Sequence, residues 1–212
     1  MSGTTLVVVE HDRGSISPAT FEALTAARAL GGSVEALSIG AAADQLTAEL
    51  AAYGVTNVHQ VHGDVLADYG PEAWGEVVAQ AVRALSPAVV LATGTDRGNE
   101  VMAQAAARLD LPFSANCIEF RSGEQFKMTR IRWGGSLLED ASMTADVKLA
   151  SVAHHAVDPT PADPPGAATT SVLSVSLDPT LARSIVKGRV ERQAGVTLST
   201  SPVVVGGGRG VG

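Results

Sequence analysis

Apolar residues along the first half of the chain form short continuous runs that alternate with segments of helical periodicity. The runs are rich in Val, Ile, Leu and Ala, and they predict strands at residues 6–9, 34–39, 55–61 and 88–92. The periodic segments repeat apolar residues three or four positions apart, and they predict helices at residues 18–30, 46–53, 74–85 and 101–109. This alternation is typical of βαβ units. It predicts an α/β protein with a mostly parallel open sheet and helices on both faces.

Hydrophobicity also predicts where two of these strands lie in the sheet. The run at 88–92 is the most apolar, which favours a central position buried on both faces. The run at 55–61 alternates in part with polar residues, which favours a place nearer an edge. Residues 93–99, which follow the predicted central strand, are expected to form a loop.

The pattern changes after Pro112. Short strands joined by glycine-containing turns are predicted at residues 118–120, 126–133, 147–152 and 172–175. They indicate antiparallel strands in the second half of the chain, added as a separate appendage or as an extension of the main sheet. Residues 158–170 are rich in Pro, Ala, Asp and Thr, a composition typical of a linker with little to bury.

Composition narrows the function. The chain has 45% hydrophobic and only 4% aromatic residues, so Ala, Val and Leu must build the core. A net charge of −7 argues against nucleic-acid binding. No apolar run approaches the ~20 residues that span a bilayer, so we expect no membrane insertion. With Cys117 as the single cysteine, no disulfide forms within the chain, and we expect a cytoplasmic protein without a signal peptide.

A glycine-rich segment near the end of the chain is the strongest candidate for cofactor binding. Three valines at 203–205 are followed by Gly206, Gly207, Gly208, Arg209 and Gly210. A β-branched run followed by glycines is how a nucleotide-binding strand–loop–helix unit opens, since glycine lets backbone N–H groups approach an anion. Arg209 adds a charge or a stacking surface. The alternative is a frayed glycine-rich tail.

A second candidate lies in residues 93–99, at the carboxyl end of the predicted central strand. In open α/β sheets, ligands bind at this end of the strands, where the N-termini of helices point. Gly94, Thr95 and Gly98 are therefore candidates to hold a phosphate group. Capping of the next helix by Thr95 or Asp96 explains the same residues without a ligand.

The remaining polar residues suggest no catalytic centre. Glu10, His11 and Asp12 end the first strand, but neighbours on a strand point to opposite faces, which favours a solvated strand end. Cys117 has no identifiable base and is expected to be a buried, unreactive thiol. The histidines lack a cysteine or carboxylate at the spacing of metal ligands, so we predict no metal site; they are His59, His62, His154 and His155.

Taken in order, several segments resemble the alpha subunit of electron-transfer flavoprotein. They cover almost the whole chain and lie at residues 6–12, 17–32, 107–120, 133–136 and 203–212. The last of them, the valine run with its Gly-Gly-Arg-Gly sequence, resembles the entry into the flavin domain of that family. The resemblance implies an adenine-nucleotide-hydrolase-like, Rossmann-like domain at residues 1–200. It also implies the first strand and glycine-rich loop of a truncated FAD-binding domain at 201–212.

The resemblance also implies a function. Members of the family are one-electron carriers in which an alpha and a beta subunit share one FAD. Electrons pass from acyl-CoA dehydrogenases or other flavin donors to a quinone reductase. By this resemblance, Arg209, Gly207, Gly208 and Gly210 contact FAD, and the rest of the chain is a scaffold that docks the beta subunit. No residue is assigned a catalytic role.

Two other interpretations stay open at the level of sequence. One is a stand-alone adenine-nucleotide-binding or regulatory module of the same α/β fold, in which residues 93–99 bind the phosphate. The other is a truncated product with no activity of its own.

Overall fold

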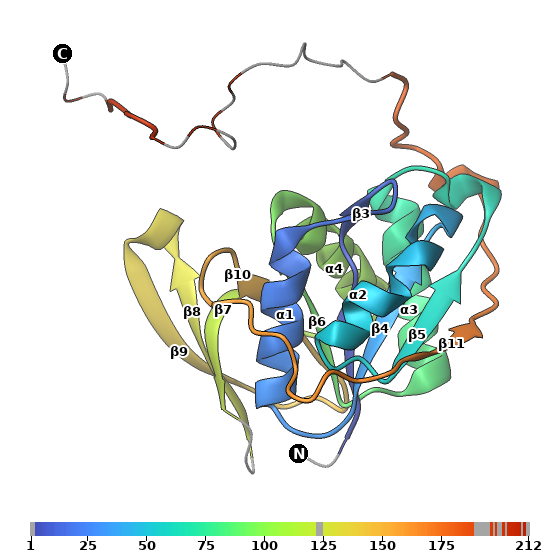
Figure 1. The fold of residues 1–212 in the computed structure, drawn as a ribbon, viewed down its shortest axis with the longest axis horizontal. Helices are drawn as coiled ribbons and strands as arrows, with labels where there is room; N and C mark the ends of the chain where they lie inside the picture. The colour runs from blue at the N-terminus through green and yellow to red at the C-terminus, as the bar shows by residue number, and fades with distance from the viewer. Residues whose placement is uncertain are drawn as a thin grey trace.

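The computed structural model describes residues 3–121, 125–188, 196, 198, 201, 203–208 and 210. Within these residues, nine strands form one sheet in the order β11-β5-β4-β1-β6-β10-β7-β8-β9 (Figure 1). The strands are β1 (Thr5–Val8), β4 (Val34–Ile39), β5 (Asn57–Val61), β6 (Val89–Gly94), β7 (Phe113–Arg121), β8 (Phe126–Arg132), β9 (Leu137–Met143), β10 (Lys148–Ala153) and β11 (Thr169–Val172). Every neighbouring pair from β11 to β7 is parallel, whereas β7, β8 and β9 pair antiparallel. The predicted fold class is confirmed.

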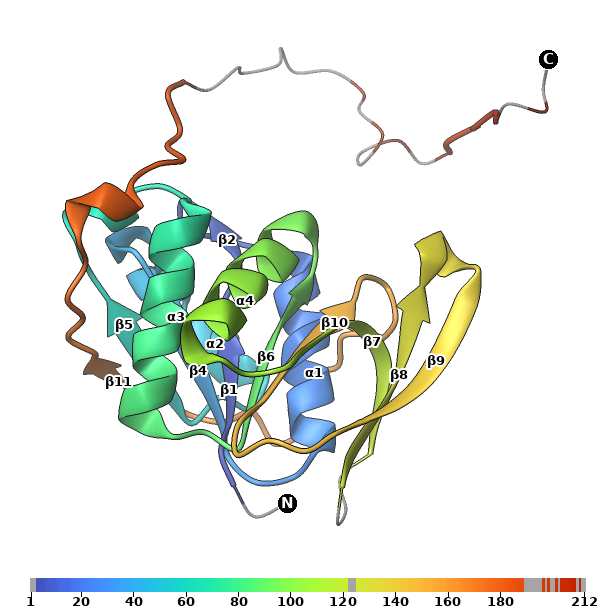
Figure 2. The same cartoon turned by 180° about the vertical axis from the view of Figure 1, so that it is seen from behind.

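Helices cover both faces of the parallel part. They are α1 (Pro18–Ala29), α2 (Thr47–Ala52), α3 (Pro71–Leu85) and α4 (Asp96–Leu109), with short 3-10 turns η1 (Ala41–Leu46), η2 (Asp64–Leu66), η3 (Trp133–Gly135) and η4 (Pro179–Leu181). A small hairpin of β2 (His11–Asp12) and β3 (Ser15–Ile16) connects β1 to α1. Figure 1 shows α1 and α2 in front of the sheet, and Figure 2 shows α3 and α4 on the opposite face. None of the helices described is long and apolar enough to cross a bilayer.

Alternate residues of each central strand pack into two separate hydrophobic cores, one on each face of the sheet. Val7 and Leu91 pack on the side of α1, whereas Leu6 and Val90 pack on the side of α3 and α4. This explains the continuous apolar runs in the sequence, because a strand covered on both faces has no position left for a polar side chain. Strand β6 lies in the middle of the sheet, between β1 and β10, as the sequence predicts.

The predicted loop at 93–99 is wrong. Strand β6 continues through Gly94 and α4 begins at Asp96, so Thr95 alone separates them. The extra strand residues pair with the last two residues of β10, Thr93 opposite Val152 and Gly94 opposite Ala153. The sequence around residue 93 could not predict this extension, because the strand with which it pairs, β10, lies about sixty positions further along the chain.

The second half of the chain extends the main sheet instead of forming a separate appendage. The run predicted at 147–152 is β10, which is not antiparallel but lies parallel between β6 and β7. Strand β9 was not predicted from the sequence, because Glu139 and Asp140 interrupt its apolar pattern. The strand predicted at 172–175 lies earlier, at Thr169–Val172, where it pairs with β5 at the edge of the sheet.

The segment predicted as a linker is held against the helices. The Arg28 guanidinium of α1 donates to the carbonyl of Thr160 at 2.6 Å, and the Ala162 N–H donates to the carbonyl of Ala52 at 2.9 Å. Its proline-rich composition therefore forms an extended connection that carries the chain from β10 to β11 across the ends of α1 and α2.

The position of Leu91 allows a direct test of the core. Leu91 is fully buried in β6, whereas Leu138 in β9 is 66% exposed. We expect Leu91→Ala to lower the free energy of unfolding by about 2–5 kcal/mol, because it leaves a cavity in a close-packed layer. Leu138→Ala removes the same atoms from the surface, and we expect a change within about 0.5 kcal/mol. Urea denaturation followed by circular dichroism measures both, and equal losses would contradict the assignment of β6 to the core.

Candidate functional site

The carboxyl ends of β1 and β6 meet where the strand order reverses. Strand β4, which follows β1 in the sequence, pairs with one edge of β1, and β6 pairs with the other edge. In open α/β sheets the crevice at such a switch point is the usual ligand site. Glu10 and His11 follow β1, and Thr93 and Thr95 lie at the end of β6, so these side chains define the candidate site.

The Glu10 carboxylate joins the two strand ends. Its Oε2 accepts a hydrogen bond from the Thr93 hydroxyl at 2.5 Å and another from the Thr95 hydroxyl. Thr95 caps α4, because its Oγ1 accepts from the Gly98 backbone N–H at 3.0 Å. A negative charge is favourable at the N-terminus of a helix. Glu10 therefore lies where an anionic ligand of α4 would bind.

Close packing explains two of the glycines near this site. A Cβ atom on Gly94 would lie 2.4 Å from the carbonyl oxygen of Val152, and one on Gly98 would lie 2.1 Å from that of Thr93. Both positions face protein backbone, so each needs glycine whether or not a ligand binds. The structure also bears out the alternative of helix capping by Thr95. A ligand role for Gly94, Thr95 and Gly98 stays a prediction.

Aromatic and basic side chains close the crevice from the side of α3 and α4. The Arg97 guanidinium lies 4.9 Å from the ring centre of Tyr69, and the Tyr69 hydroxyl donates to Glu100 at 2.9 Å. Burial, and next the hydrogen bond to Glu100, raise the pKa of Tyr69 well above its usual value. The rings of His11 and Trp74 lie 5.4 Å apart. These side chains leave two small cavities, of about 10 Å³ and about 20 Å³, each with room for about one water molecule.

The prediction of a solvated strand end is wrong for two of its three residues. His11 is buried and its Nε2 lies 2.8 Å from the carbonyl oxygen of Ile39, while Glu10 is half-buried. The two side chains do point to different partners, as the strand geometry predicts. Sequence reasoning missed Tyr69, Trp74 and Arg97, because the residues carry no motif and come from separate elements.

The glycine-rich segment does not form a cofactor pocket within the described residues. Arg209 lies outside them. Gly207, Gly208 and Gly210 are exposed, and a Cβ atom added to Gly208 or Gly210 would meet no atom within 4 Å. The described part of this segment therefore offers backbone N–H groups but no walls for a flavin, and it does not by itself fit FAD.

Tertiary structure gives three histidines the carboxylate partners that sequence spacing does not show. His59 Nε2 lies 2.5 Å from Glu35, and His62 Nε2 lies 3.0 Å from Asp44. His155 contacts Glu22, a residue 133 positions away in the sequence. The prediction of no metal site relied on the lack of such partners.

Cys117 is buried, as the sequence predicts. Its Sγ lies 3.5 Å from the carbonyl oxygen of Ser114, and its side chain is inaccessible to solvent. Burial raises the pKa of the Cys117 thiol to about 11, because the apolar surroundings disfavour the thiolate. The neutral thiol therefore contributes to stability at neutral pH. This contribution is lost as the pH rises from the usual value of about 8.5 through the raised value.

Comparison with known proteins decides the family. The family model described as "Electron transfer flavoprotein domain" matches residues 5–179. The chain belongs to the electron transfer flavoprotein family. A probable mitochondrial electron transfer flavoprotein subunit alpha of Caenorhabditis elegans is 30% identical over 212 residues, which cover 98% of this chain and 62% of that relative.

Bacterial relatives carry the same subunit name. The alpha subunit of Bacillus subtilis is 26% identical and that of Mycobacterium leprae 29% identical, with this chain covering 66% and 64% of their lengths. The resemblance to the alpha subunit of electron transfer flavoproteins is thus confirmed along nearly the whole chain. The chain spans about two thirds of the length of these relatives.

The bonds around Glu10 predict a measurable loss of stability in Glu10→Ala. The substitution removes the acceptor of the buried Thr93 hydroxyl, and we expect the free energy of unfolding to fall by about 1–3 kcal/mol. Glu49→Ala, at an exposed position of α2, is the matched control and should change it by no more than about 0.5 kcal/mol. Urea denaturation compares the two variants. An equal effect would mean that the carboxylate does not join the two strand ends.

Burial of Cys117 predicts its reactivity. We expect the folded chain to react with a thiol reagent such as DTNB at about pH 8 more slowly than free cysteine by at least about two orders of magnitude, as the raised pKa implies. The same chain in urea should release one equivalent at the ordinary rate. Rapid reaction of the folded chain would show that the thiol is accessible.

Proposed function

We propose that this chain is part of the alpha subunit of an FAD-dependent electron carrier, in which it docks a beta subunit and helps to position the flavin. The observation that carries the proposal is the family match across residues 5–179, together with relatives that all bear the alpha-subunit name.

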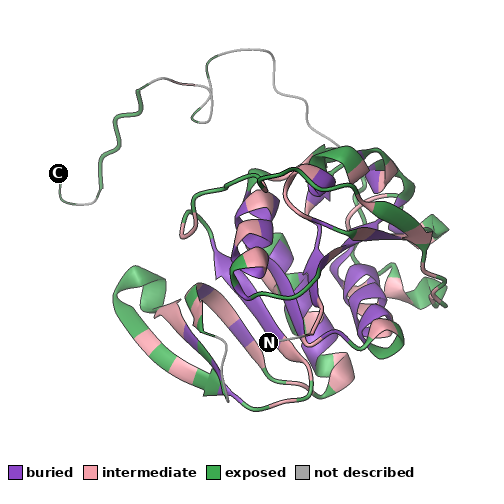
Figure 3. Cartoon of the chain, turned by 60° about the horizontal axis from the view of Figure 1, so that its bottom comes forward, coloured by how far each residue is buried: buried purple, intermediate pink, exposed green. Residues whose placement is uncertain are grey.

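The docking surface that we propose is the outer tip, defined by Trp133, Leu137 and Leu138. These side chains are 81%, 55% and 66% exposed. They come from η3 and the start of β9, at the end of the β8–β9 hairpin, which Figure 3 colours mainly as exposed. Clustered apolar side chains in contact with water mark protein interfaces, and Trp is among the residues that dominate interface energies. The partner to which we assign this surface is the beta subunit.

Ion pairs keep the hairpin behind the outer tip in one shape. Arg130 binds both oxygens of Glu139, at 2.9 and 3.2 Å, and Arg132 approaches the same carboxylate at 3.3 Å. The hydrogen bonds from Arg130 hold the pKa of Glu139 below its usual value. A preformed surface loses less conformational entropy when its partner binds, which favours docking.

FAD and the redox partners are part of the same proposal. The segment 206–210, including Arg209, would contact the flavin together with groups that the described residues do not supply. Acyl-CoA dehydrogenases or other flavin donors would reduce the carrier, and a quinone reductase would reoxidise it. The cytoplasmic location stays a prediction. The alternative of a stand-alone adenine-nucleotide module is less well supported, because the Glu10 carboxylate lies where its phosphate would bind.

Co-expression with a beta-type subunit from the same source tests this proposal. We expect the two chains to elute as a heterodimer in size-exclusion chromatography. Trp133→Ser and Leu138→Ser should weaken the complex by about 30-fold or more, the loss typical of central interface residues. Val172→Ser is the matched control, since Val172 is equally exposed, at 67%, but lies on the opposite edge of the sheet.

The visible absorbance of the same elution peak separates the two parts of the proposal. A yellow heterodimer would support both docking and flavin binding, and Arg209→Ala should then reduce the colour. A colourless heterodimer would retain the scaffold and contradict flavin binding by this chain. A colourless monomer would contradict the carrier function for this chain.

A further inference from the structure

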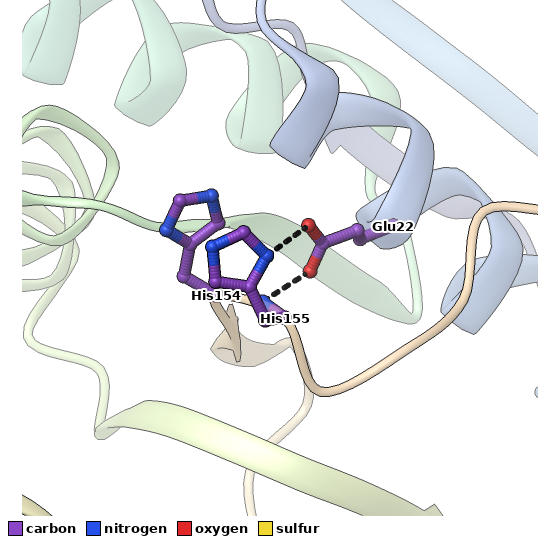
Figure 4. Close-up of side chains that lie close together, drawn as sticks. All are labelled: Glu22, His154 and His155. Carbon is purple, nitrogen blue, oxygen red and sulfur yellow. Dashed lines mark hydrogen bonds and ion pairs between the residues drawn. The ribbon is translucent and has the colours of Figure 1, made fainter. Parts of the chain in front are cut away.

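Two consecutive histidines and a buried glutamate meet at the surface of the molecule, and none of the three lines the crevice between β1 and β6. His154 and His155 follow the last residue of β10, and Glu22 lies on α1 (Figure 4). One potential ligand atom from each residue lies within 4.8 Å of the other two. We name these three residues the His-His-Glu cluster.

Backbone geometry holds the cluster together. The His155 backbone N–H donates to Glu22 Oε2 at 2.8 Å, which directs the other carboxylate oxygen toward the His155 ring, 3.9 Å from its Nδ1. His155 has a positive φ of 62°, so the chain turns sharply after β10 and brings its imidazole back over α1. The two imidazoles stack with their centres 3.8 Å apart, so both rings are on the same side of the turn.

Among the described residues, the Glu22 carboxylate accepts one hydrogen bond, from the His155 backbone N–H, but has no cationic side chain within hydrogen-bond distance. Glu22 is only 4% exposed, although buried carboxylates are normally paired with a cation. Among the described residues, the ion pair that Glu22 forms is the 3.9 Å contact with His155, which is beyond hydrogen-bond distance. A bound cation would neutralise this carboxylate and use the imidazoles beside it.

We propose that Glu22, His154 and His155 bind one divalent transition-metal ion of the zinc class. Two imidazole nitrogens and one carboxylate oxygen are donors that Zn²⁺ and its neighbours Co²⁺ and Ni²⁺ accept, and three protein ligands leave a position for water. With metal–ligand bonds of about 2.1 Å, tetrahedral ligand atoms lie about 3.4 Å apart. The His155 side chain is 82% exposed, so its imidazole can rotate to close the remaining distance without moving the core.

The position of the cluster gives the ion a structural consequence. Glu22 belongs to the helix that covers the sheet, whereas the histidines end a strand in the middle of that sheet. The ion would therefore crosslink α1 to the end of β10, through Glu22 and His155, which are 133 positions apart in the sequence. This role is independent of flavin binding and of the beta subunit.

Titration of the untagged chain with Co²⁺ tests the proposal, because a polyhistidine tag would bind the same ions. We expect one equivalent to bind with visible absorption bands, and Zn²⁺ to displace it. His154→Ala, His155→Ala and Glu22→Gln should each weaken binding by at least about tenfold, the smallest loss found even for residues that only support metal ligands. His62→Ala is the matched control, since His62 is a histidine paired with a single carboxylate, and it should bind as the unmodified chain does.

Folding of each variant is checked by circular dichroism in the absence of metal. The exposed histidines can be replaced without disturbing the core, so the His154→Ala variant keeps the test decisive even if Glu22→Gln is unstable. A rise in melting temperature with Zn²⁺ that disappears in the histidine variants would further support the site. Failure of the chain to bind Co²⁺, or equal binding by the double variant His154→Ala/His155→Ala, would overturn the proposal.

Discussion

Burial of the parallel strands on both faces requires a helix layer on each side of the sheet, and this requirement organises the whole molecule. Strand β6 is surrounded by β1, β10 and both helix layers, so its apolar residues belong to two cores at once. Parallel sheets are stable only when covered in this way. The short α-helices rich in alanine allow the layers to approach closely, which fits a chain with only 4% aromatic residues.

The same requirement explains why the outer strands differ from the rest. Beyond β7 the sheet becomes antiparallel, and antiparallel strands tolerate one face in water. Strand β8 buries Phe126 and Met128 and β9 buries Met143, whereas the residues of both strands nearer the outer tip are partly or fully exposed. A surface of this kind at the edge of an otherwise covered sheet is suited to a partner subunit, which agrees with the scaffold role that we propose.

The carboxyl edge of the sheet offers the usual position for a ligand, but the chain fills it with its own groups. Glu10 supplies the negative charge at the N-terminus of α4, and Thr93 and Thr95 donate to it. Tyr69, Trp74 and Arg97 lie among the residues that leave two cavities, each about the size of one water molecule. The hydrogen bonds at this edge join the ends of β1 and β6 and so stabilise the fold. The His-His-Glu cluster, by contrast, keeps its two imidazoles open to solvent.

Local patterns in the sequence were sufficient for the fold class and for most elements of the parallel part, although not for β9. The strand at 34–39 has the predicted bounds, and the central place of β6 follows from its continuous apolar run, because hydrophobic periodicity depends only on neighbouring residues. The family could also be recognised from the order of short motifs. The insertion of β10 between β6 and β7 could not be predicted from the sequence, because an apolar run indicates a buried strand but does not identify the strands that pair with it.

The polar contacts were decided by the tertiary structure alone. Glu10 meets Thr93 across 83 residues, and Glu22 meets His155 across 133. In the sequence Glu10 and the histidines were interpreted from their immediate neighbours, which gave a solvated strand end and no metal site. Hydrogen bonds and ion pairs act over a few ångströms in space, whatever the separation along the chain. The sequence by itself therefore determined most of the strands and helices, whereas only the packing of α1 and β10 against β1 and β6 decided which charged side chains share a site.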